Sequence, residues 1–302
     1  EGGCGFPRAP ELLECEMSAS MQSNYDHFSA LGREADRDRY LATLFAPAEH
    51  RDALFALYAF NIEISRVREL AREPMPGEIR LQWWREALSG EREGEAEAHP
   101  VAAALRAALA RYGFVVTPLL ELIDAHSFDL YAEPMATLAD LELYAIRTQS
   151  PLFATAAGFL GSGSAPPETF TLDASVATTV GKVLSDLPRH AARRQLYLPL
   201  EVLERHQVKP EQVFAEQANG PLFAALAELR AFARQHLEAA QAKFASMPPE
   251  LLSPFLPLAL LGSTLRRMER ADYTPFQFRP LPPWRRQWLL WRAARNPDRI
   301  FS

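Results

Sequence analysis

Cysteine is nearly absent from this chain of 302 residues. The two cysteines are Cys4 and Cys15, so the rest of the sequence has none. A disulfide framework for the core is therefore excluded, and we expect neither a zinc site built on cysteine nor catalysis by a thiol. This pattern fits a reducing compartment and predicts a cytoplasmic protein.

The sequence also lacks an excess of positive charge and a long apolar run. Its formal net charge is −6, whereas non-specific binding to nucleic acid needs a basic surface. We therefore exclude nucleic acid as a partner. No apolar stretch reaches the length that a membrane-spanning helix needs, so any contact with a membrane is expected to be peripheral.

Glycine is scarce, with 14 residues, and no segment alternates between polar and β-branched apolar residues, so no sheet is expected. Apolar residues instead recur with helical spacing, and the predicted fold class is all-α. Helices are predicted from Pro47 to a stop at 73–77, and over 79–88, 100–112, 117–131, 137–160, 168–187, 219–246, 249–270 and a last segment after 281–284. The charged stretch 90–98 and the Gly-Ser-Pro stretch 161–167 are predicted to be a surface connection and a loop.

The first residues follow no clear periodicity, and they lack the basic and then apolar pattern of a signal peptide. We predict that residues 1–20 are a leader, a tag or a disordered tail. Residues 21–302 are predicted to form one helical domain, with the largely apolar segment 137–160 at its centre.

Four stretches carry a resemblance to a known family. They are K-V-L-S-D-L-P-R-H-A-A-R-R-Q-L-Y-L-P at 182–199, D-R-D-R-Y-L-A-T-L-F-A-P-A-E-H-R-D-A-L-F-A-L-Y-A-F at 36–60, I-R-L-Q-W-W-R-E-A-L at 79–88 and F-D-L-Y at 128–131. In this order they resemble the squalene/phytoene synthase family, over roughly residues 25 to 295. The resemblance implies the isoprenoid synthase fold, with long helices around a central cavity. It also implies enzymes that join two prenyl diphosphates head to head with Mg²⁺.

The resemblance places the metal motifs of the family on two helices, where this sequence departs from them. The first motif, Asp-Asp-x-x-Asp, aligns with Ser65, Arg66 and Glu69, and the second, Asp-x-x-x-Asp, aligns with Asp186 and His190. Mg²⁺ prefers carboxylate oxygen, and two of five carboxylates remain. Catalysis with Glu63, Glu69 and Asp186 would therefore use a reduced metal site, with Glu69 and Asp186 as the metal ligands. Glu63 is expected to pair with Arg66, three residues on.

The same pocket also has the groups to bind an anion without metal, because the guanidinium of arginine suits phosphate oxygens. The candidate substrate-binding residues are Arg66, Lys182, His190, Arg193, Arg194 and Tyr197. The ligand would be a prenyl diphosphate or a lipid phosphate. His126, near Asp124 and Asp129 on a helix expected to line the pocket, is interpreted as a structural histidine.

These departures resemble a branch of the family with eroded aspartate motifs, which includes a mitochondrial complex I assembly factor. The first hypothesis is thus a non-catalytic or altered homologue that binds a prenyl or lipid diphosphate, has an assembly-factor-like role and contacts a protein partner. The alternative is an active prenyltransferase, with a phosphatase or hydrolase as a weaker third reading.

A last feature is a row of tryptophans near the end of the chain. Trp284, Trp288 and Trp291 fall on one helix face, with arginines around them. Tryptophan beside arginine suits a membrane interface. The interpretation we favour packs these tryptophans on the core and leaves the arginines in water.

Overall fold

A computed structural model describes residues 28, 30–71, 73–131, 133–161 and 165–301. The predicted leader at 1–20 lies outside these residues, as do both cysteines. The first helices are α2 (Arg37–Thr43), α3 (Ala48–Ser65), α4 (Val67–Leu70), α5 (Pro74–Ser89), α6 (Glu93–Ala98), α7 (Pro100–Tyr112), α8 (Thr117–Ala125) and the 3-10 helix η1 (His126–Leu130). They are followed by α9 (Leu138–Leu160), α10 (Glu168–Ser185), α11 (Leu187–Ala192), α12 (Leu200–Arg205), α13 (Pro210–Phe214), α14 (Gly220–Lys243), α15 (Leu258–Met268), α16 (Pro283–Arg295) and the 3-10 helix η6 (Pro297–Phe301). The described residues contain no strand, so the all-α prediction is confirmed.

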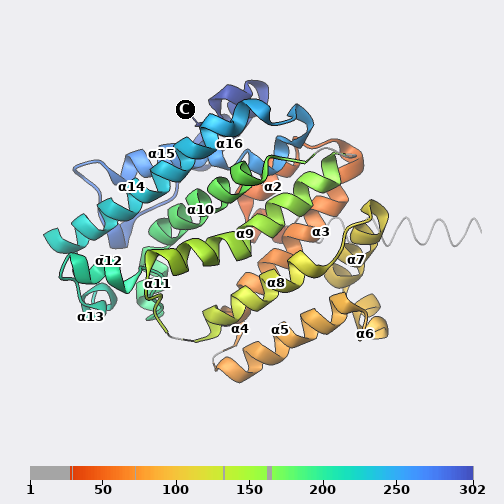
Figure 1. Ribbon diagram of the computed structural model, residues 1–302, viewed down its shortest axis with the longest axis horizontal. Helices are drawn as coiled ribbons and strands as arrows, with labels where there is room; N and C mark the ends of the chain where they lie inside the picture. The colour runs from red at the N-terminus through yellow and green to blue at the C-terminus, as the bar shows by residue number, and fades with distance from the viewer. Residues whose placement is uncertain (1–27, 29, 72, 132, 162–164, 302) are drawn as a thin grey trace, which may run out of the picture.

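The centre of the molecule is formed by α9 and α10, which lie between the helices α14 to α16 on one side and α5, α7 and α8 on the other (Figure 1). Helix α9 begins with a capping box in which Thr137 and Asp140 exchange side-chain and backbone hydrogen bonds, which fixes the start of the helix. Buried residues then follow on most of its faces. A helix that is apolar on most sides must be surrounded, so the prediction that 137–160 lies at the centre is confirmed.

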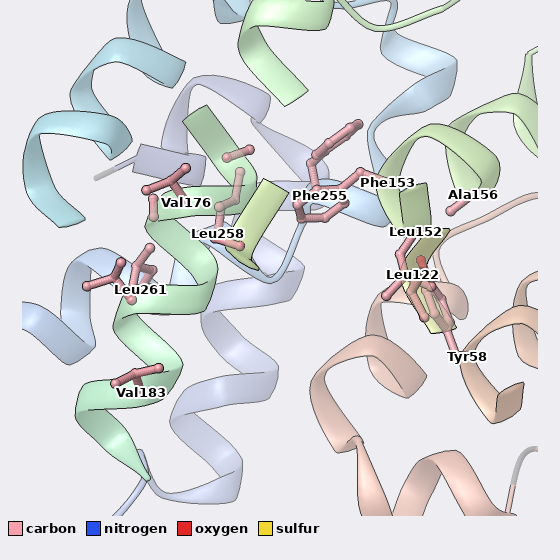
Figure 2. Packing of buried hydrophobic residues seen from close by; sticks show 14 of the residues in the cluster. Tyr58, Leu122, Leu152, Phe153, Ala156, Val176, Val183, Phe255, Leu258 and Leu261 are labelled. Atoms are coloured by element: carbon pink, nitrogen blue, oxygen red, sulfur yellow. The ribbon is translucent and has the colours of Figure 1, made fainter. Parts of the chain in front are cut away.

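The core is one continuous cluster of buried apolar residues that runs from Phe28 to Ile300. On α3 every residue from Ala53 to Ile62 is buried. Aromatic rings link distant segments: Phe153 of α9 stacks on Phe255 with ring centroids 4.7 Å apart (Figure 2). Offset and tilted ring pairs of this kind stabilise a core beyond the area that they bury.

Proline decides where several predicted helices differ from the observed ones. The stretch 73–77 begins α5 instead of only ending the preceding helix, because proline fits the first turn, where no hydrogen-bond donor is needed. The predicted helix at 249–270 is α-helical only from Leu258, after two 3-10 turns with prolines at 249 and 254. The predicted connection 90–98 contains α6, and α12 and α13 were not predicted.

The prediction for the tryptophan row is wrong. Trp284, Trp288 and Trp291 are 69%, 48% and 47% exposed, while α16 buries Leu289, Leu290 and Ala293. The helix has two apolar faces, and the aliphatic face is the one that packs on the core. In the part of the chain that the structure describes, no helix combines the length and the apolar character that crossing a bilayer requires.

Candidate functional site

The two helices that carry the motif positions are both interrupted at a motif residue. Helix α3 ends at Ser65 and α4 starts at Val67, so that Arg66 separates them. Helix α10 ends at Ser185 and α11 starts at Leu187, with Asp186 between them. For α10 the cause lies in the sequence, because Pro188 has no N–H to donate to a carbonyl one turn earlier. Each break turns the following residues toward the space between the helices.

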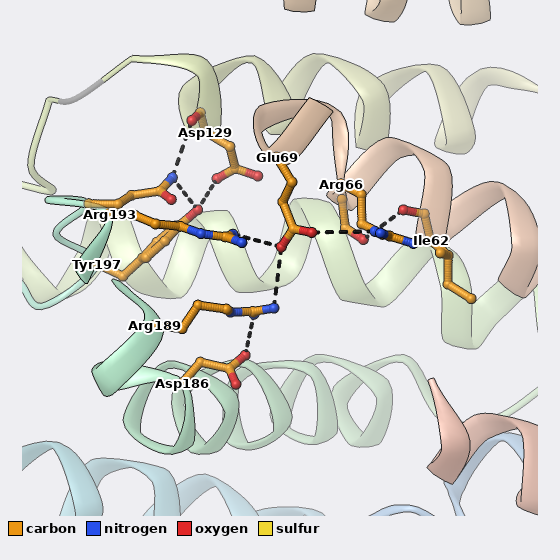
Figure 3. Close-up of polar contacts among 10 residues, drawn as sticks. Ile62, Arg66, Glu69, Asp129, Asp186, Arg189, Arg193 and Tyr197 are labelled. Carbon is orange, nitrogen blue, oxygen red and sulfur yellow. Dashed lines mark hydrogen bonds and ion pairs between the residues drawn. The ribbon is translucent and has the colours of Figure 1, made fainter. Parts of the chain in front are cut away.

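Five charged side chains, those of Arg66, Glu69, Asp186, Arg189 and Arg193, form one network of ion pairs (Figure 3). Glu69 Oε1 accepts from Arg193 Nη1 at 2.7 Å and from Arg189 Nη1 at 3.4 Å. Arg189 Nη2 also donates to Asp186 Oδ2 at 2.7 Å. Burial alone would raise the pKa of Glu69, but the hydrogen bond from Arg193 and the charges of Arg193 and Arg189 lower the pKa overall. Glu69 therefore stays ionised and compensates the arginines.

Arg66 and the remaining acidic candidate, Glu63, are also paired. Arg66 Nε donates to the second oxygen of Glu69 at 3.3 Å. The predicted pair between Glu63 and Arg66 is wrong. Glu63 instead accepts a hydrogen bond from Arg80 of α5 at 3.2 Å, and His99 Nε2 lies 3.7 Å from the same carboxylate. The i, i+3 spacing fails here because Arg66 lies past the end of α3 and its side chain follows α4.

This arrangement does not fit a magnesium cluster. Among the residues that the structure describes, no three carboxylate, histidine or cysteine side chains gather closely enough to hold a metal ion. Each of the candidate ligands Glu69 and Asp186 is already within hydrogen-bonding distance of a guanidinium group. A dication would have to displace those arginines, against like-charge repulsion of about 4 kcal/mol per pair of unit charges at 4 Å and an effective dielectric of 20.

Next to this network lies a cavity of about 110 Å³ between α3, α9 and α10. Its walls are mostly polar and come from α2, α3, η1, α9, α10 and α11 and from the segment that follows α11. The lining residues are Arg39, Asn61, Ser65, His126, Asp129, Tyr144, Thr148, Gln149, Thr179, Lys182, Val183, Asp186, Arg189, His190 and Tyr197. Of the predicted site residues, the fold thus brings Lys182, Asp186, His190 and Tyr197 together in one cavity. Glu63, Glu69, Arg66 and Arg193 are absent from its lining, and Arg194 lies over the ring of Phe214 at 4.9 Å.

One wall of the cavity is a buried carboxylate whose oxygens are fully used. Asp129, 6% exposed, accepts hydrogen bonds from the hydroxyls of Tyr144 and Tyr197, at 2.9 and 2.7 Å to Oδ1, and its Oδ2 lies 2.7 Å from Nδ1 of His126. Burial and the charge of Asp129 raise the pKa values of Tyr144 and Tyr197 well above the usual range for tyrosine. Both hydroxyls therefore remain protonated donors, and this cluster is a structural unit.

The cavity also contains two buried nitrogen atoms that have no hydrogen-bond partner in the part of the chain that the structure describes. The side-chain nitrogen Nε2 of Gln149 and the ring nitrogen Nδ1 of His190 are both buried and have no hydrogen-bond partner among the described residues. Gln149 is held in place because its oxygen accepts from Arg39 Nη2 at 2.7 Å. No described residue forms an ion pair with Lys182. Burial lowers the pKa of His190 to about 4, although the charge of Asp186 acts in the other direction, so this imidazole is neutral at pH 7.

The family profile of squalene/phytoene synthase matches residues 33–292. This chain belongs to the squalene/phytoene synthase family. The family match confirms the predicted resemblance, and the solved structures of the family confirm the predicted isoprenoid synthase fold. A solved squalene synthase from Alicyclobacillus acidocaldarius superposes with a TM-score of 0.72 at 21% identity, over 85% of this chain and 97% of that one.

Two curated family relatives differ in what their names say. The chain is 28% identical to NADH dehydrogenase (ubiquinone) complex I, assembly factor 6 of Rattus norvegicus, over 81% of this chain and 73% of the relative. It is 24% identical to a phytoene synthase of Arthrospira platensis, over 90% of this chain and 93% of the relative. The predicted likeness to both an assembly factor and a synthase is confirmed.

Arg39, Tyr144 and Gln149 are among the members of the cavity that sequence reasoning missed. Each lies on a helix whose pattern was correctly recognised or on the segment that matched the family. Helical spacing alone does not say which polar residue faces inward. A signal was present in α9, where Tyr144, Thr148 and Pro151 fall about one turn apart on a helix predicted to be buried.

Proposed function

We propose that this member of the squalene/phytoene synthase family binds the phosphate head of a prenyl or lipid diphosphate without magnesium, and that it has an assembly-factor-like role instead of condensing two substrates. The observation that carries the proposal is the pair of buried cavity nitrogens without a hydrogen-bond partner among the described residues, Nε2 of Gln149 and Nδ1 of His190. A buried amide N–H without an acceptor costs about 1–3 kcal/mol. An anion that accepts from Gln149 would recover that energy.

The charges around the cavity support an anionic ligand. Three cations, Arg39, Lys182 and Arg189, face two carboxylates, Asp129 and Asp186. Asp129 is saturated by its tyrosines and by His126, and Asp186 accepts from Arg189. Lys182 is therefore the cation best placed to meet a phosphate oxygen, with Gln149 as a neutral donor beside it.

The size of the cavity indicates which part of the ligand is held. Its volume of about 110 Å³ is below the roughly 300–1,000 Å³ that pockets for drug-sized ligands usually have. The lining is mostly polar, with Val183 as its aliphatic member. We infer that a phosphate or diphosphate head enters the cavity, while the chain of the lipid stays outside.

The alternative function is an active prenyltransferase with a reduced metal site at Glu63, Glu69 and Asp186. It requires Arg66, Arg80, Arg189 and Arg193 to release these carboxylates when magnesium binds. The pairs are partly exposed, so each contributes at most about 1 kcal/mol. The binding energy of magnesium and a diphosphate would have to exceed the summed energy of these ion pairs and the remaining repulsion between the metal ion and the arginines.

The assembly-factor-like role is supported by the names of the relatives. The rat protein matches over most of this chain at 28% identity, and the human protein of the same name matches at 27% over 83% of this chain. Deletion of the gene in the source organism tests this part. We expect less assembled NADH dehydrogenase on a native gel, restored by the wild-type gene and equally by Asp186→Ala. If the wild-type gene restored assembly and the Asp186→Ala gene did not, a catalytic role would be favoured.

Titration calorimetry with inorganic pyrophosphate and with farnesyl diphosphate, each with and without Mg²⁺, tests the binding proposal. We expect both ligands to bind without metal and with affinities within about tenfold of each other, because the head is what the cavity holds. Lys182→Ala should weaken both at least tenfold, while Lys209→Ala, an exposed lysine outside the cavity, should leave them unchanged. Binding that strictly needs Mg²⁺ would instead restore the prenyltransferase.

A further inference from the structure

The C-terminal helix α16 presents two different faces. Leu289, Leu290 and Ala293 are buried against the core, while Trp284, Trp288 and Trp291 point away from it, with roughly half or more of each side chain exposed. Residues at i, i+4 and i+7 lie in a row on one side of a helix. The three indole rings therefore form one continuous stripe about 10 Å long, given a rise of about 1.5 Å per residue.

Such a stripe is unusual for a surface that faces only water. Single exposed apolar side chains are normal, whereas contiguous apolar patches mark sites of interaction. Among the other large exposed apolar side chains of the described residues none is a tryptophan, and Met75 and Ile79 on α5 form only a pair, four residues apart. The α16 stripe is therefore the exposed apolar feature that most needs an occupant.

Arginine borders the stripe and extends along it. The guanidinium of Arg292 lies 4.9 Å from the ring centre of Trp288, and that of Arg295 lies 5.0 Å from the ring centre of Trp291. Arg285 is exposed on the same helix. The helix has no acidic residue, although the chain as a whole carries −6. This face is thus a positive, aromatic patch on an otherwise acidic protein.

One arginine of α16 turns inward and fixes the helix. Arg286 Nε donates to Asp38 Oδ1 of α2 at 2.8 Å. Burial raises the pKa of Asp38, although the hydrogen bond from Arg286 opposes this rise. This ion pair is about three-quarters buried and joins two helices, so it resists rotation of α16. Together with the buried aliphatic face of α16, it keeps the tryptophan stripe pointing outward.

We propose that the face formed by Trp284, Trp288, Trp291 and the adjacent arginines docks on the surface of an anionic lipid bilayer, with α16 parallel to the membrane. Indole rings prefer the interfacial layer, where an apolar body meets polar headgroups. Arginines at the same level would pair with lipid phosphates, each contributing about 1 kcal/mol near an anionic surface. Charge complementarity selects an anionic occupant, and the row of tryptophans favours a bilayer over an acidic protein because indole rings prefer the membrane interface.

Co-sedimentation of the full chain with vesicles tests the proposal. Phosphatidylcholine vesicles with about 30% phosphatidylglycerol are compared with pure phosphatidylcholine, and tryptophan emission is recorded in parallel. We expect binding to the anionic vesicles with a blue shift of the emission, and at least tenfold weaker binding to the neutral ones. The triple variant Trp284→Ala, Trp288→Ala, Trp291→Ala should lower the partition coefficient at least tenfold.

Matched controls separate this surface from general stickiness and from the cavity. Met75→Ala with Ile79→Ala removes exposed apolar side chains elsewhere and should leave vesicle binding unchanged. Arg285→Glu with Arg295→Glu should abolish the preference for anionic vesicles. Binding of pyrophosphate by the tryptophan variant should equal that of the wild type, because the cavity is formed by other helices. Absence of vesicle binding by the wild type, or equal binding by the triple variant, overturns the proposal, and a dimer that dissociates on the triple substitution would assign the face to a second copy instead.

Discussion

Glu69 of α4 and Asp186, at the junction of α10 and α11, share the guanidinium of Arg189. The resemblance to the family puts metal ligands at these two positions. Here an arginine occupies the space between their carboxylates and takes the place of positive charge that a cation would supply. The same guanidinium lines the cavity, so it neutralises these two carboxylates beside the cavity nitrogens that we propose bind an anion.

The strongest link of the ion-pair network is measurable. A double-mutant cycle with Glu69→Gln and Arg193→Ala should give a coupling energy of about 0.5–1 kcal/mol, because the pair is 2.7 Å apart and partly shielded from water. The free energy of unfolding in urea is the readout. The matched cycle on Arg270 and Asp272, whose side chains are 66% and 71% exposed, should show no coupling. Equal coupling in both cycles would mean that the network adds nothing beyond surface pairing.

The Asp129 cluster should dominate stability near the cavity. Asp129→Ala leaves two tyrosine hydroxyls and His126 without their acceptor, so we expect a loss of about 3–5 kcal/mol in the free energy of unfolding. Tyr197→Phe removes one donor to the carboxylate and should cost about 1–2 kcal/mol. Thermal and chemical unfolding check both values. A cost below 1 kcal/mol for Asp129→Ala would show that water replaces the lost acceptor.

His190 should make stability depend on pH. Its pKa in the folded protein is about 4, below the ordinary value near 6.5, so the unfolded chain binds the proton first as the pH falls. The contribution is fully present above pH 6.5 and is lost between pH 6.5 and 4, with a loss of about 2 kcal/mol at pH 5. The difference in unfolding free energy between the wild type and His190→Asn should therefore shrink by that amount from pH 7.5 to pH 5. A difference that does not change with pH contradicts the buried neutral imidazole.

The surroundings of two glycines predict that substitution by alanine will change the free energy of unfolding in opposite directions. A Cβ at Gly158 of α9 would lie 1.8 Å from the end of the Phe114 ring, whereas a Cβ at Gly94 of α6 would meet nothing within 4 Å. Gly158→Ala should lower the free energy of unfolding by about 1–3 kcal/mol, because the ring must move. Gly94→Ala should raise it by about 0.5–1 kcal/mol, because alanine favours the helix. Calorimetric melting of both variants checks the signs.

The sequence was sufficient for the fold class and for most helices, because apolar periodicity reports which segments are helical and how deeply they are buried. It also placed Asp186, Lys182 and His190 near one another through the family motifs. It could not identify the partner of each arginine. Glu69 pairs with Arg193 across 124 positions of sequence, and a long-range pair of this kind depends on how two helix breaks orient the chain.

The exposed tryptophans show a second limit of sequence reasoning. The spacing of Trp284, Trp288 and Trp291 correctly placed them on one face of a helix. It could not decide between that face and the one formed by Leu289, Leu290 and Ala293, because both are apolar. The choice depends on the shape of the surface that receives the helix, and small aliphatic side chains fit closer to α15 and η6 than indole rings do.

The pair between Arg286 and Asp38 joins two residues that are 248 positions apart, near the two ends of the described fold. Opening at one end therefore removes a partner from the other. A protease that cut before Pro283 and released α16 would leave Asp38 without its guanidinium and uncover the neighbouring part of α2. We therefore expect α2 and α16 to open together as one unit of local unfolding, and hydrogen exchange at α2 should accelerate as soon as α16 detaches.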